Sequence, residues 1–393
     1  MIPDYYEFRS ATKILSGENA IEHIPYELAN LGVTRAMIVT DALVRQLGLV
    51  QPVVEALLDS DIELGTVFDD VPVDSSVEVC NRLADIYRDH RCDGLVAIGG
   101  GSVLDTAKGV AIVLAGGSAD LMELRGSEIL MHPKMPPFLA VPTTAGTGSE
   151  VTGAAVIKDI ERNVKMAFVS FDLAPHVAVL DPRMTVGLPA RLTASTAMDA
   201  LVHAIEAASG RQRNPLSDAY AYAAIALVRE NLAAVIADGR DTKARLALAN
   251  AALMSGIAFS NSMVGIVHAL GHACGALAHV PHGDAMAILL PHCMRFNLEV
   301  AGPAYAELLL PLAGADVYAA TPPEMRATAA IVAAFDLLAI AAAAGVPVSL
   351  SEAGVTEELL PRIAASALDD GSMGMTPKPA DLDDTLAILR AAM

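Results

Sequence analysis

Short apolar runs alternate with helix-like stretches through the first half of the chain. Four of these runs end at polar or glycine residues: AMIVTD (36–41), DGLVAIGGG (93–101), FLAVPTT (138–144) and HVAVLDP (176–182). Between them, stretches such as SVEVCNRLADIYRDH (76–90) carry apolar residues at helical spacing. Strands that alternate with helices are typical of βαβ units. The pattern therefore predicts an α/β domain with a parallel sheet, whose ligands bind beyond the carboxyl ends of the strands.

The pattern becomes helical near residue 188 and stays so almost to the end. RLTASTAMDALVHAIEAA (191–208) has helical periodicity and opens with Thr193 and Ser195, either of which is a residue type that caps a helix start. We therefore predict two domains, an α/β domain at residues 1–187 and an all-α domain at residues 188–393.

One segment of the second half resembles a membrane span by hydropathy alone. ATAAIVAAFDLLAIAAAAGV (327–346) is apolar over almost its whole length, yet it contains Asp336 and consists largely of alanine. Pro322 and Pro347 bracket it. These features favour a helix buried in a bundle over a membrane span.

Composition narrows the class of partner. The chain has 393 residues, of which 53% are hydrophobic, and a formal net charge of −20. Such a charge argues against a nucleic acid or an anionic membrane surface as partner, because both require a basic patch. The four cysteines form no C-x-x-C pair, and the first ten residues, MIPDYYEFRS, contain no long apolar run. We expect a cytoplasmic protein from a reducing compartment, without a signal peptide.

A glycine-rich loop follows the second of the four runs. VAIGGGSVLDTAKGVA (96–111) reads as strand, tight turn and helix. Backbone amides at the start of a helix form a natural phosphate cradle, although a tight connection without ligand remains the alternative. The loop is not the G-x-G-x-x-G fingerprint, because Leu104 stands where the third glycine belongs, and no Gly-Lys-Ser/Thr follows.

Two further features favour the phosphate-binding interpretation. PTTAGTGSE (142–150) is a second loop of small and hydroxyl residues after a strand. Asp41 closes the run AMIVTD, a position from which a carboxylate accepts hydrogen bonds from ribose hydroxyls. Such a carboxylate would repel a 2′-phosphate and select NAD over NADP. The alternative for Asp41 is the cap of a turn or helix.

A carboxylate and an imidazole share one helix face in the second half. Asp199 and His203 stand four residues apart in AMDALVHAIEA (197–207). A buried carboxylate needs a cation or several hydrogen-bond donors as partner. A simple Asp–His hydrogen bond inside a bundle is the alternative to a metal site.

VHALGHACGALAHVPHG (267–283) adds four histidines. His268 and His272 also stand four apart, and His282 follows a break at Pro281 that folds it back toward the helix. One carboxylate with two or three imidazoles suits a first-row transition metal with an open coordination position. Spacing alone leaves open which histidines ligate; His279 and His292 are the weaker candidates.

Four motifs occur in the order found in a known family. GGGSVLDTAKGVA, PTTAGTGSEVT, AVLDPRMTVGLPARLTASTAMDALVHAIE and VHALGHACGALAHVPHG resemble the iron-containing (group III) alcohol dehydrogenases, and the likeness runs over essentially the whole chain. The resemblance implies a Rossmann-like dinucleotide-binding domain followed by an all-α metal-binding domain. It implies reversible hydride transfer between a primary alcohol or diol and NAD, giving an aldehyde. Iron(II), with zinc(II) as the alternative, and a homodimer or larger homo-oligomer are also implied.

The resemblance assigns roles to individual residues. The metal ligands correspond to Asp199, His203, His268 and His282, and His272 to a catalytic neighbour of the nicotinamide and substrate. The cofactor-binding positions correspond to Asp41, Gly99, Gly100, Gly101, Ser102, Thr143, Thr144, Ser149, Lys165 and Leu180. Where many members carry Asn-Pro-Thr, this chain has Asp74-Ser75-Ser76, so the substrate pocket should not be copied from relatives.

Two alternatives remain at this stage. One is a glycerol-dehydrogenase-like or dehydroquinate-synthase-like member of the same superfamily, which shares the two-domain plan. The other is a metal-free NAD-binding sensor or scaffold, which metal analysis with an alcohol assay would distinguish. The substrate stays open among short primary alcohols, diols such as 1,3-propanediol, and aldehydes such as lactaldehyde.

Overall fold

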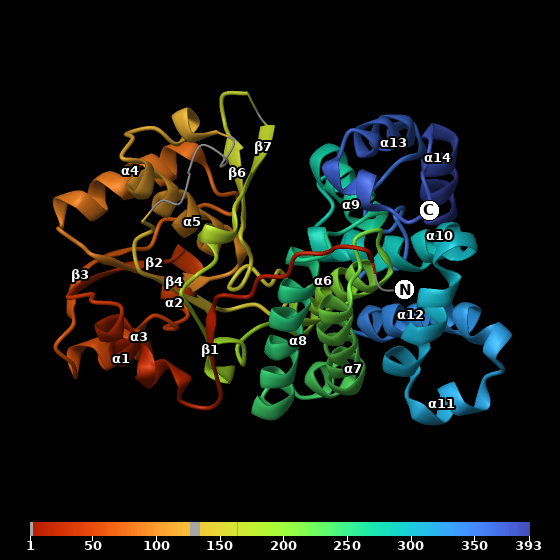
Figure 1. Cartoon of the computed structure of the whole chain (residues 1–393), viewed down its shortest axis with the longest axis horizontal. Coiled ribbons are helices and arrows are strands. Elements are labelled where there is room, and N and C mark those ends of the chain that lie inside the picture. The colour runs from red at the N-terminus through yellow and green to blue at the C-terminus, as the bar shows by residue number, and fades with distance from the viewer. Residues whose placement is uncertain (1–2, 126–133, 163) are drawn as a thin grey trace. The chain divides into compact units, whose positions relative to one another are not determined.

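The chain forms two compact units in this computed structural model, which describes residues 3–125, 134–162 and 164–393 (Figure 1). The α/β unit spans residues 9–187. The helical unit comprises residues 188–393 together with the opening segment up to Phe8. The ring of Phe8 stacks on that of Tyr220 with their centroids 6.0 Å apart, which joins the opening segment to the helical unit.

A six-stranded sheet forms the centre of the α/β unit. Its order is β1-β8-β5-β4-β2-β3, and neighbouring strands run parallel. The strands are β1 (Lys13–Ser16), β2 (Arg35–Val39), β3 (Glu63–Phe68), β4 (Gly94–Gly99), β5 (Phe138–Pro142) and β8 (Val177–Leu180). The predicted runs correspond to β2, β4, β5 and β8, which confirms the parallel sheet. The antiparallel hairpin of β6 (Ala154–Asp159) and β7 (Val164–Val169) was not predicted.

Helices cover both faces of this sheet. They are α1 (Ile24–Asn30), α2 (Ala42–Gln46), α3 (Gln51–Leu58), α4 (Val77–Asp89) and α5 (Gly101–Gly116). Along β2, Met37 and Val39 enter one apolar cluster with residues of α4 and α5, whereas Ala36 and Ile38 enter another with residues of α1 and α3. Because both faces are buried, the strand reads as one continuous apolar run in the sequence.

The direction of winding reverses between β2 and β4. The chain passes from β2 outward to β3, returns to β4 on the other side of β2, and then continues to β5. Val39 pairs with Ala97, and Gly99 pairs with Pro142, so the loops after β2, β4 and β5 begin side by side at the carboxyl ends of these strands. Ligands bind at such a reversal in open α/β sheets.

The helical unit packs around α6. Its helices are α6 (Ala190–Ser209), α7 (Pro215–Ala237), α8 (Thr242–Ser260), α9 (Ile266–Ala278), α10 (His282–Ala313), α11 (Ala315–Ala320), α12 (Arg326–Ala343), α13 (Leu360–Leu368) and α14 (Leu382–Ala391). Helices α7, α8 and α10 all pack on α6, most of which is buried. The unit is all-α over its described residues, as predicted.

The predicted cap of α6 was wrong. The helix begins at Ala190, with Pro189 at the N-cap, so Thr193 and Ser195 lie inside it. Pro189 starts the helix earlier because a proline is tolerated at a helix start. The Thr193 hydroxyl accepts a hydrogen bond from Nη1 of Arg245 at 2.7 Å and is buried.

The apolar stretch near residue 330 forms α12 in the bundle. One face of α12, which includes Ile331 and Leu338, is buried, and the helix packs on α10 and α6. By length and composition alone, the segments 215–237 and 323–343 are long and apolar enough to cross a membrane. Core helices of soluble proteins pass the same test.

Candidate functional site

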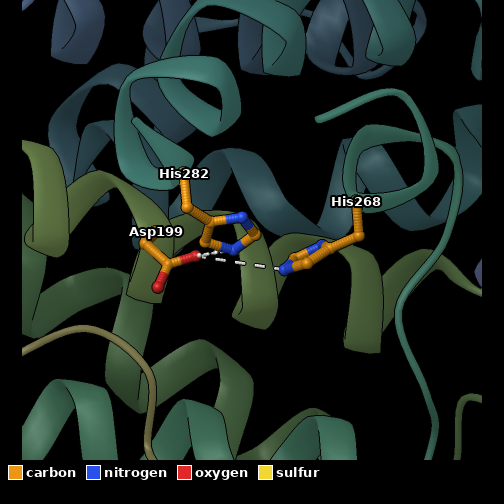
Figure 2. A group of neighbouring side chains, drawn as sticks. All are labelled: Asp199, His268 and His282. Carbon is orange, nitrogen blue, oxygen red and sulfur yellow. Dashed lines mark ion pairs between the residues drawn. The ribbon is translucent and has the colours of Figure 1, made fainter. Parts of the chain in front are cut away.

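Side chains from three helices meet around one carboxylate oxygen in the helical unit. Asp199 and His203 lie one turn apart on α6, His268 lies on α9, and His282 is the first residue of α10. Oδ1 of Asp199 is 3.3 Å from Nε2 of His282, 3.7 Å from Nδ1 of His203 and 3.9 Å from Nε2 of His268. Figure 2 shows His268 and His282 pointing toward Asp199, and ligand atoms of these three residues lie within 4.8 Å of one another.

Three of these atoms are buried without a hydrogen-bond partner. They are Oδ1 of Asp199, Nδ1 of His203 and Nε2 of His268. An unsatisfied buried polar atom costs about 1–3 kcal/mol, so three at one point are expensive unless something binds there. A carboxylate oxygen with imidazole nitrogens is a donor set that suits a divalent first-row metal ion. The group therefore fits a metal ion.

The protonation states suit ligation as well. Burial lowers the pKa of His203 to about 3 and lowers the pKa of His268 well below its usual value, so both rings are neutral at pH 7. Burial acts to raise the pKa of Asp199, but the positive charge that His203 and then His282 carry when protonated, with the hydrogen bond to His282, outweighs it and holds that pKa below its usual range. A metal ion needs neutral imidazoles and an ionised carboxylate, and these pKa directions favour that combination.

The link between α9 and α10 returns His282 to the group. α9 ends at Ala278, and its C-cap, His279, adopts the left-handed conformation with φ of 57°. Pro281 is then the N-cap of α10. The rings of His268 and His282 consequently have their centroids 5.6 Å apart, while His279 is exposed and lies outside the group.

A glycine permits the close approach of α10 to α6. A Cβ at Gly283 would lie 2.3 Å from the carbonyl oxygen of Ser195, a distance that real Cβ atoms essentially never show. Gly283 directly follows His282, so this contact sets where His282 lies relative to Asp199.

His272 forms a pair with a carboxylate that the sequence analysis missed. Its Nδ1 lies 2.8 Å from Oδ2 of Asp370, and its ring stacks on that of His282 with centroids 5.4 Å apart. Asp370 is the N-cap of a 3₁₀ helix, η8 (Gly371–Met375), and accepts a hydrogen bond from the backbone N–H of Ser372. Burial acts to raise the pKa of Asp370, but the bond to His272 outweighs it, so the carboxylate is ionised.

A second missed carboxylate, Glu206, supports His268. Oε2 of Glu206 is 2.6 Å from Nδ1 of His268, and the two Glu206 oxygens accept backbone N–H bonds from Gly265 and Val267. Burial raises the pKa of Glu206 to about 7 against the lowering effect of these N–H groups. The signal was present in the spacing, since Glu206 stands three residues after His203 on the same helix face.

The glycine loop lies at the carboxyl end of β4, in the interior of the sheet of the α/β unit. Gly99 ends β4, Gly100 is the N-cap of α5, and Gly101 is its first residue. The backbone N–H of Thr143 donates to the carbonyl of Gly99 at 3.1 Å, and a Cβ at Gly100 would lie 3.6 Å from the side chain of Thr144. The structure therefore brings the predicted glycines and threonines together.

Asp41 and Ser102 lie just beyond the carboxyl ends of β2 and β4, and each side chain already has a hydrogen-bond partner. Oδ1 of Asp41 caps α2 by accepting the backbone N–H of Val44 at 2.9 Å. The Ser102 hydroxyl donates to the carbonyl of Val73. Asp41 is thus a helix cap, the alternative considered from the sequence, and a carboxylate has a second oxygen for a ribose hydroxyl.

Ser149 belongs to a buried polar network. Its hydroxyl donates to Oδ1 of Asp105 and accepts from Nζ of Lys108, both at 2.8 Å. Lys108 is fully buried and also donates to the Thr152 hydroxyl and the Ala154 carbonyl. Burial lowers the pKa of Lys108 to about 8. The network ties the Ser149 loop to α5.

The two remaining predicted cofactor residues lie elsewhere in the α/β unit. Lys165 is on β7, and its Nζ is 2.8 Å from Oδ1 of Asp74, part of the Asp-Ser-Ser departure from the family pattern. Leu180 ends β8 and is buried, and its carbonyl accepts the N–H of Gly17.

Two family descriptions match the two halves of the chain. "Iron-containing alcohol dehydrogenase" matches residues 11–182, and "Fe-containing alcohol dehydrogenase family, C-terminal" matches residues 193–393. The match therefore spans nearly the whole sequence.

Individual relatives agree with these matches. The chain is 38% identical over 379 residues to a 1,3-propanediol dehydrogenase of Klebsiella pneumoniae, covering 96% of each chain. It is 34% identical over 377 residues to an NAD-dependent methanol dehydrogenase of Bacillus methanolicus, covering 96% of this chain and 97% of that one. A crystal structure of 1,3-propanediol oxidoreductase matches with a TM-score of 0.93 at 34% identity, over 99% of this chain and 100% of the other. These relatives lend no support to the glycerol-dehydrogenase, dehydroquinate-synthase or sensor alternatives.

Proposed function

The chain belongs to the iron-containing alcohol dehydrogenase family, and we propose that it interconverts a primary alcohol or diol and its aldehyde with NAD and a bound metal ion. The family uses NAD and iron, and zinc(II) suits the same donor set. The observation that carries the proposal is the group of buried, unpartnered donor atoms on Asp199, His203 and His268.

We assign Asp199, His203, His268 and His282 as the ligands of that metal ion. When bound, the metal ion supplies Lewis-acid polarisation of the substrate oxygen. The ionised Asp199 offsets part of the positive charge of the ion, and the neutral rings of His203 and His268 donate lone pairs. Burial keeps water from competing at the ligand atoms of these three residues.

His272 is the proposed proton-handling residue. Asp370 engages Nδ1 of His272, which leaves Nε2 as the nitrogen that takes or returns the proton of the alcohol. The ring is about half exposed, with 46% of its side-chain surface accessible, so that proton can exchange with solvent. The carboxylate of Asp370 holds the ring through Nδ1 while Nε2 takes or returns the proton.

The α/β unit is the proposed NAD-binding domain. The backbone amides of Gly99, Gly100, Gly101 and Ser102 at the start of α5 hold the pyrophosphate, and NAD supplies the hydride acceptor. Asp41 binds the adenosine ribose through the oxygen that does not cap α2. The further cofactor contacts proposed are Thr143, Thr144, Ser149, Lys165 and Leu180.

We further propose that the enzyme is cytoplasmic and homo-oligomeric. All four cysteines are buried and free, which suits a reducing compartment. Strand β1 is an edge of the six-stranded sheet, and an exposed edge is a surface on which another chain can pair. Light scattering after size exclusion, with a dimer or larger as the expected result and a monomer as the contrary one, tests the assembly.

The proposed reaction is tested with apoenzyme reconstituted with Fe(II) or Zn(II). Short primary alcohols, diols and the corresponding aldehydes are assayed with NAD and NADP. We expect metal-dependent NADH formation that Asp199→Ala and His268→Ala abolish together with bound metal. His279→Asn is the matched control, because asparagine accepts the left-handed conformation and His279 lies outside the group. A metal-replete, fully active Asp199→Ala enzyme would refute the assignment.

A further inference from the structure

We infer that Glu206 is a positioning residue of the metal centre, which holds the His268 ring with Nε2 directed at the other ligands. The inference rests on the proposed function, because it assigns a role toward the metal ion proposed above. Glu206 does not belong to the proposed ligand set and acts through His268.

The contact between the two side chains sets the tautomer of His268. The distance of 2.6 Å between Oε2 of Glu206 and Nδ1 of His268 is that of a short, charge-assisted hydrogen bond. Both oxygens of Glu206 accept backbone N–H bonds from the start of α9, so Glu206 acts as an acceptor toward His268 as well. Nδ1 of His268 then carries the proton, and Nε2 keeps its lone pair. Nε2 is the buried atom without a partner, 3.9 Å from Oδ1 of Asp199. A carboxylate behind a ligating histidine commonly acts in this way.

Glu206 is itself held in place by the start of α9. It accepts the N–H of Gly265 at 2.9 Å and that of Val267 at 2.7 Å. Gly265 is the N-cap of α9 and has no side chain to cap the helix, so Glu206 caps α9 from the neighbouring helix. One carboxylate thus fixes both the first turn of α9 and the histidine on that turn.

Glu206 also links His268 to α6, the helix that carries the proposed ligands Asp199 and His203. Asp199, His203 and Glu206 follow one another at four and three residues along α6, which places them on one face. All three side chains are buried. Glu206 thus links α9, which carries His268, to α6, which carries Asp199 and His203.

Metal affinity measured without turnover tests this role. Glu206→Gln keeps the length of the side chain but removes its charge, and an amide cannot accept from all three donors at once. We expect affinity for Zn(II), from competition with a chelator, to fall about 10- to 100-fold. The absorption bands of the Co(II)-substituted protein should shift as well, because the ring orientation and ligand basicity change. A purely structural cap would leave that spectrum unmoved in the folded protein.

Asp241→Asn is the matched control. Asp241 caps α8 by accepting the N–H of Ala244, so this variant also removes a capping charge from the helical unit. We expect its Zn(II) affinity and Co(II) spectrum to equal those of the wild type. Glu206→Asp is a second variant that keeps the charge but shortens the reach, and it should lower affinity even if Glu206→Gln fails to fold.

The outcomes separate this inference from the proposed function. A folded Glu206→Gln or Glu206→Asp protein with affinity within twofold of the wild type and an unshifted spectrum overturns the role of Glu206. A wild-type protein that binds no metal ion overturns the proposed function instead, whatever the variants do.

Discussion

Replacing Gly283 with alanine should displace one proposed ligand without altering any ligand side chain. Gly283 directly follows His282 in the first turn of α10. A Cβ there would lie 2.3 Å from the carbonyl oxygen and 2.6 Å from the hydroxyl oxygen of Ser195 on α6. The nearest atom is backbone in a buried helix, so it cannot rotate away.

The size of the effect follows from these distances. Ordinary contact begins at 3.4 Å, so the first turn of α10 must move roughly 1 Å from α6. Metal–ligand distances tolerate about 0.2 Å, so His282 would leave its proposed position. Overpacking of this kind costs about 1–3 kcal/mol. If that cost falls on the bound state, metal affinity drops roughly 5- to 150-fold at about tenfold per 1.4 kcal/mol.

Competition with a chelator measures the metal affinity of the Gly283→Ala protein. Thermal unfolding of its apoprotein measures the loss of stability. Gly275→Ala on α9 is the control, because a Cβ there meets nothing nearer than the Val280 carbonyl at 3.5 Å. We expect the control to bind metal normally and to gain up to about 1 kcal/mol from helix propensity. Unchanged metal affinity in a folded Gly283→Ala protein would refute the reasoning.

Three further predictions concern the carboxylates of Asp41, Glu150 and Asp370. Asp41→Ser keeps a capping oxygen but removes the charge, so kcat/KM with NADP should rise relative to NAD; an unchanged ratio contradicts the ribose role. Burial raises the pKa of Glu150 to about 7, and a hydrogen bond from its own backbone N–H and the charge of Lys108 offset this only in part. The proton held by folded Glu150 stabilises the protein below pH 4.5, and this contribution is lost as the pH rises to 7. Glu150→Gln should therefore weaken the fall in the free energy of unfolding over that range, measured by urea titration; an identical profile contradicts it. Asp370→Asn keeps the cap of η8 but weakens the hold on His272, so kcat should fall about tenfold or more at full metal content; an unchanged kcat contradicts the pairing.

The fold was predictable where burial leaves a strong local pattern. The interior strands of the sheet are β2, β4, β5 and β8. Both faces of these strands are buried, so their sequences are continuous apolar runs. β1 (KILS) and β3 (ELGTVF) are edge strands with exposed or half-buried residues, and their sequences carry no such run. The β6–β7 hairpin buries only alternate residues, so its strands are not continuous buried runs either.

Residue spacing predicted part of the site where its geometry is local, whereas only the family resemblance implied that His268 and His282 join Asp199. The spacing of Asp199 and His203 places both on one helix face, and the structure brings both to the same point. Asp370 lies 98 residues from His272 in sequence, so no local pattern links them. The need for glycine at position 283 likewise depends on Ser195, which the fold brings near it.

Anomalous diffraction from crystals of the zinc-reconstituted protein, recorded at the zinc edge, tests the central claim most directly. The account predicts one strong peak per chain at the group, with Asp199, His203, His268 and His282 within about 2.0–2.2 Å of it. A peak elsewhere, or none in protein that retains zinc, would contradict the assignment of these residues as the catalytic metal centre.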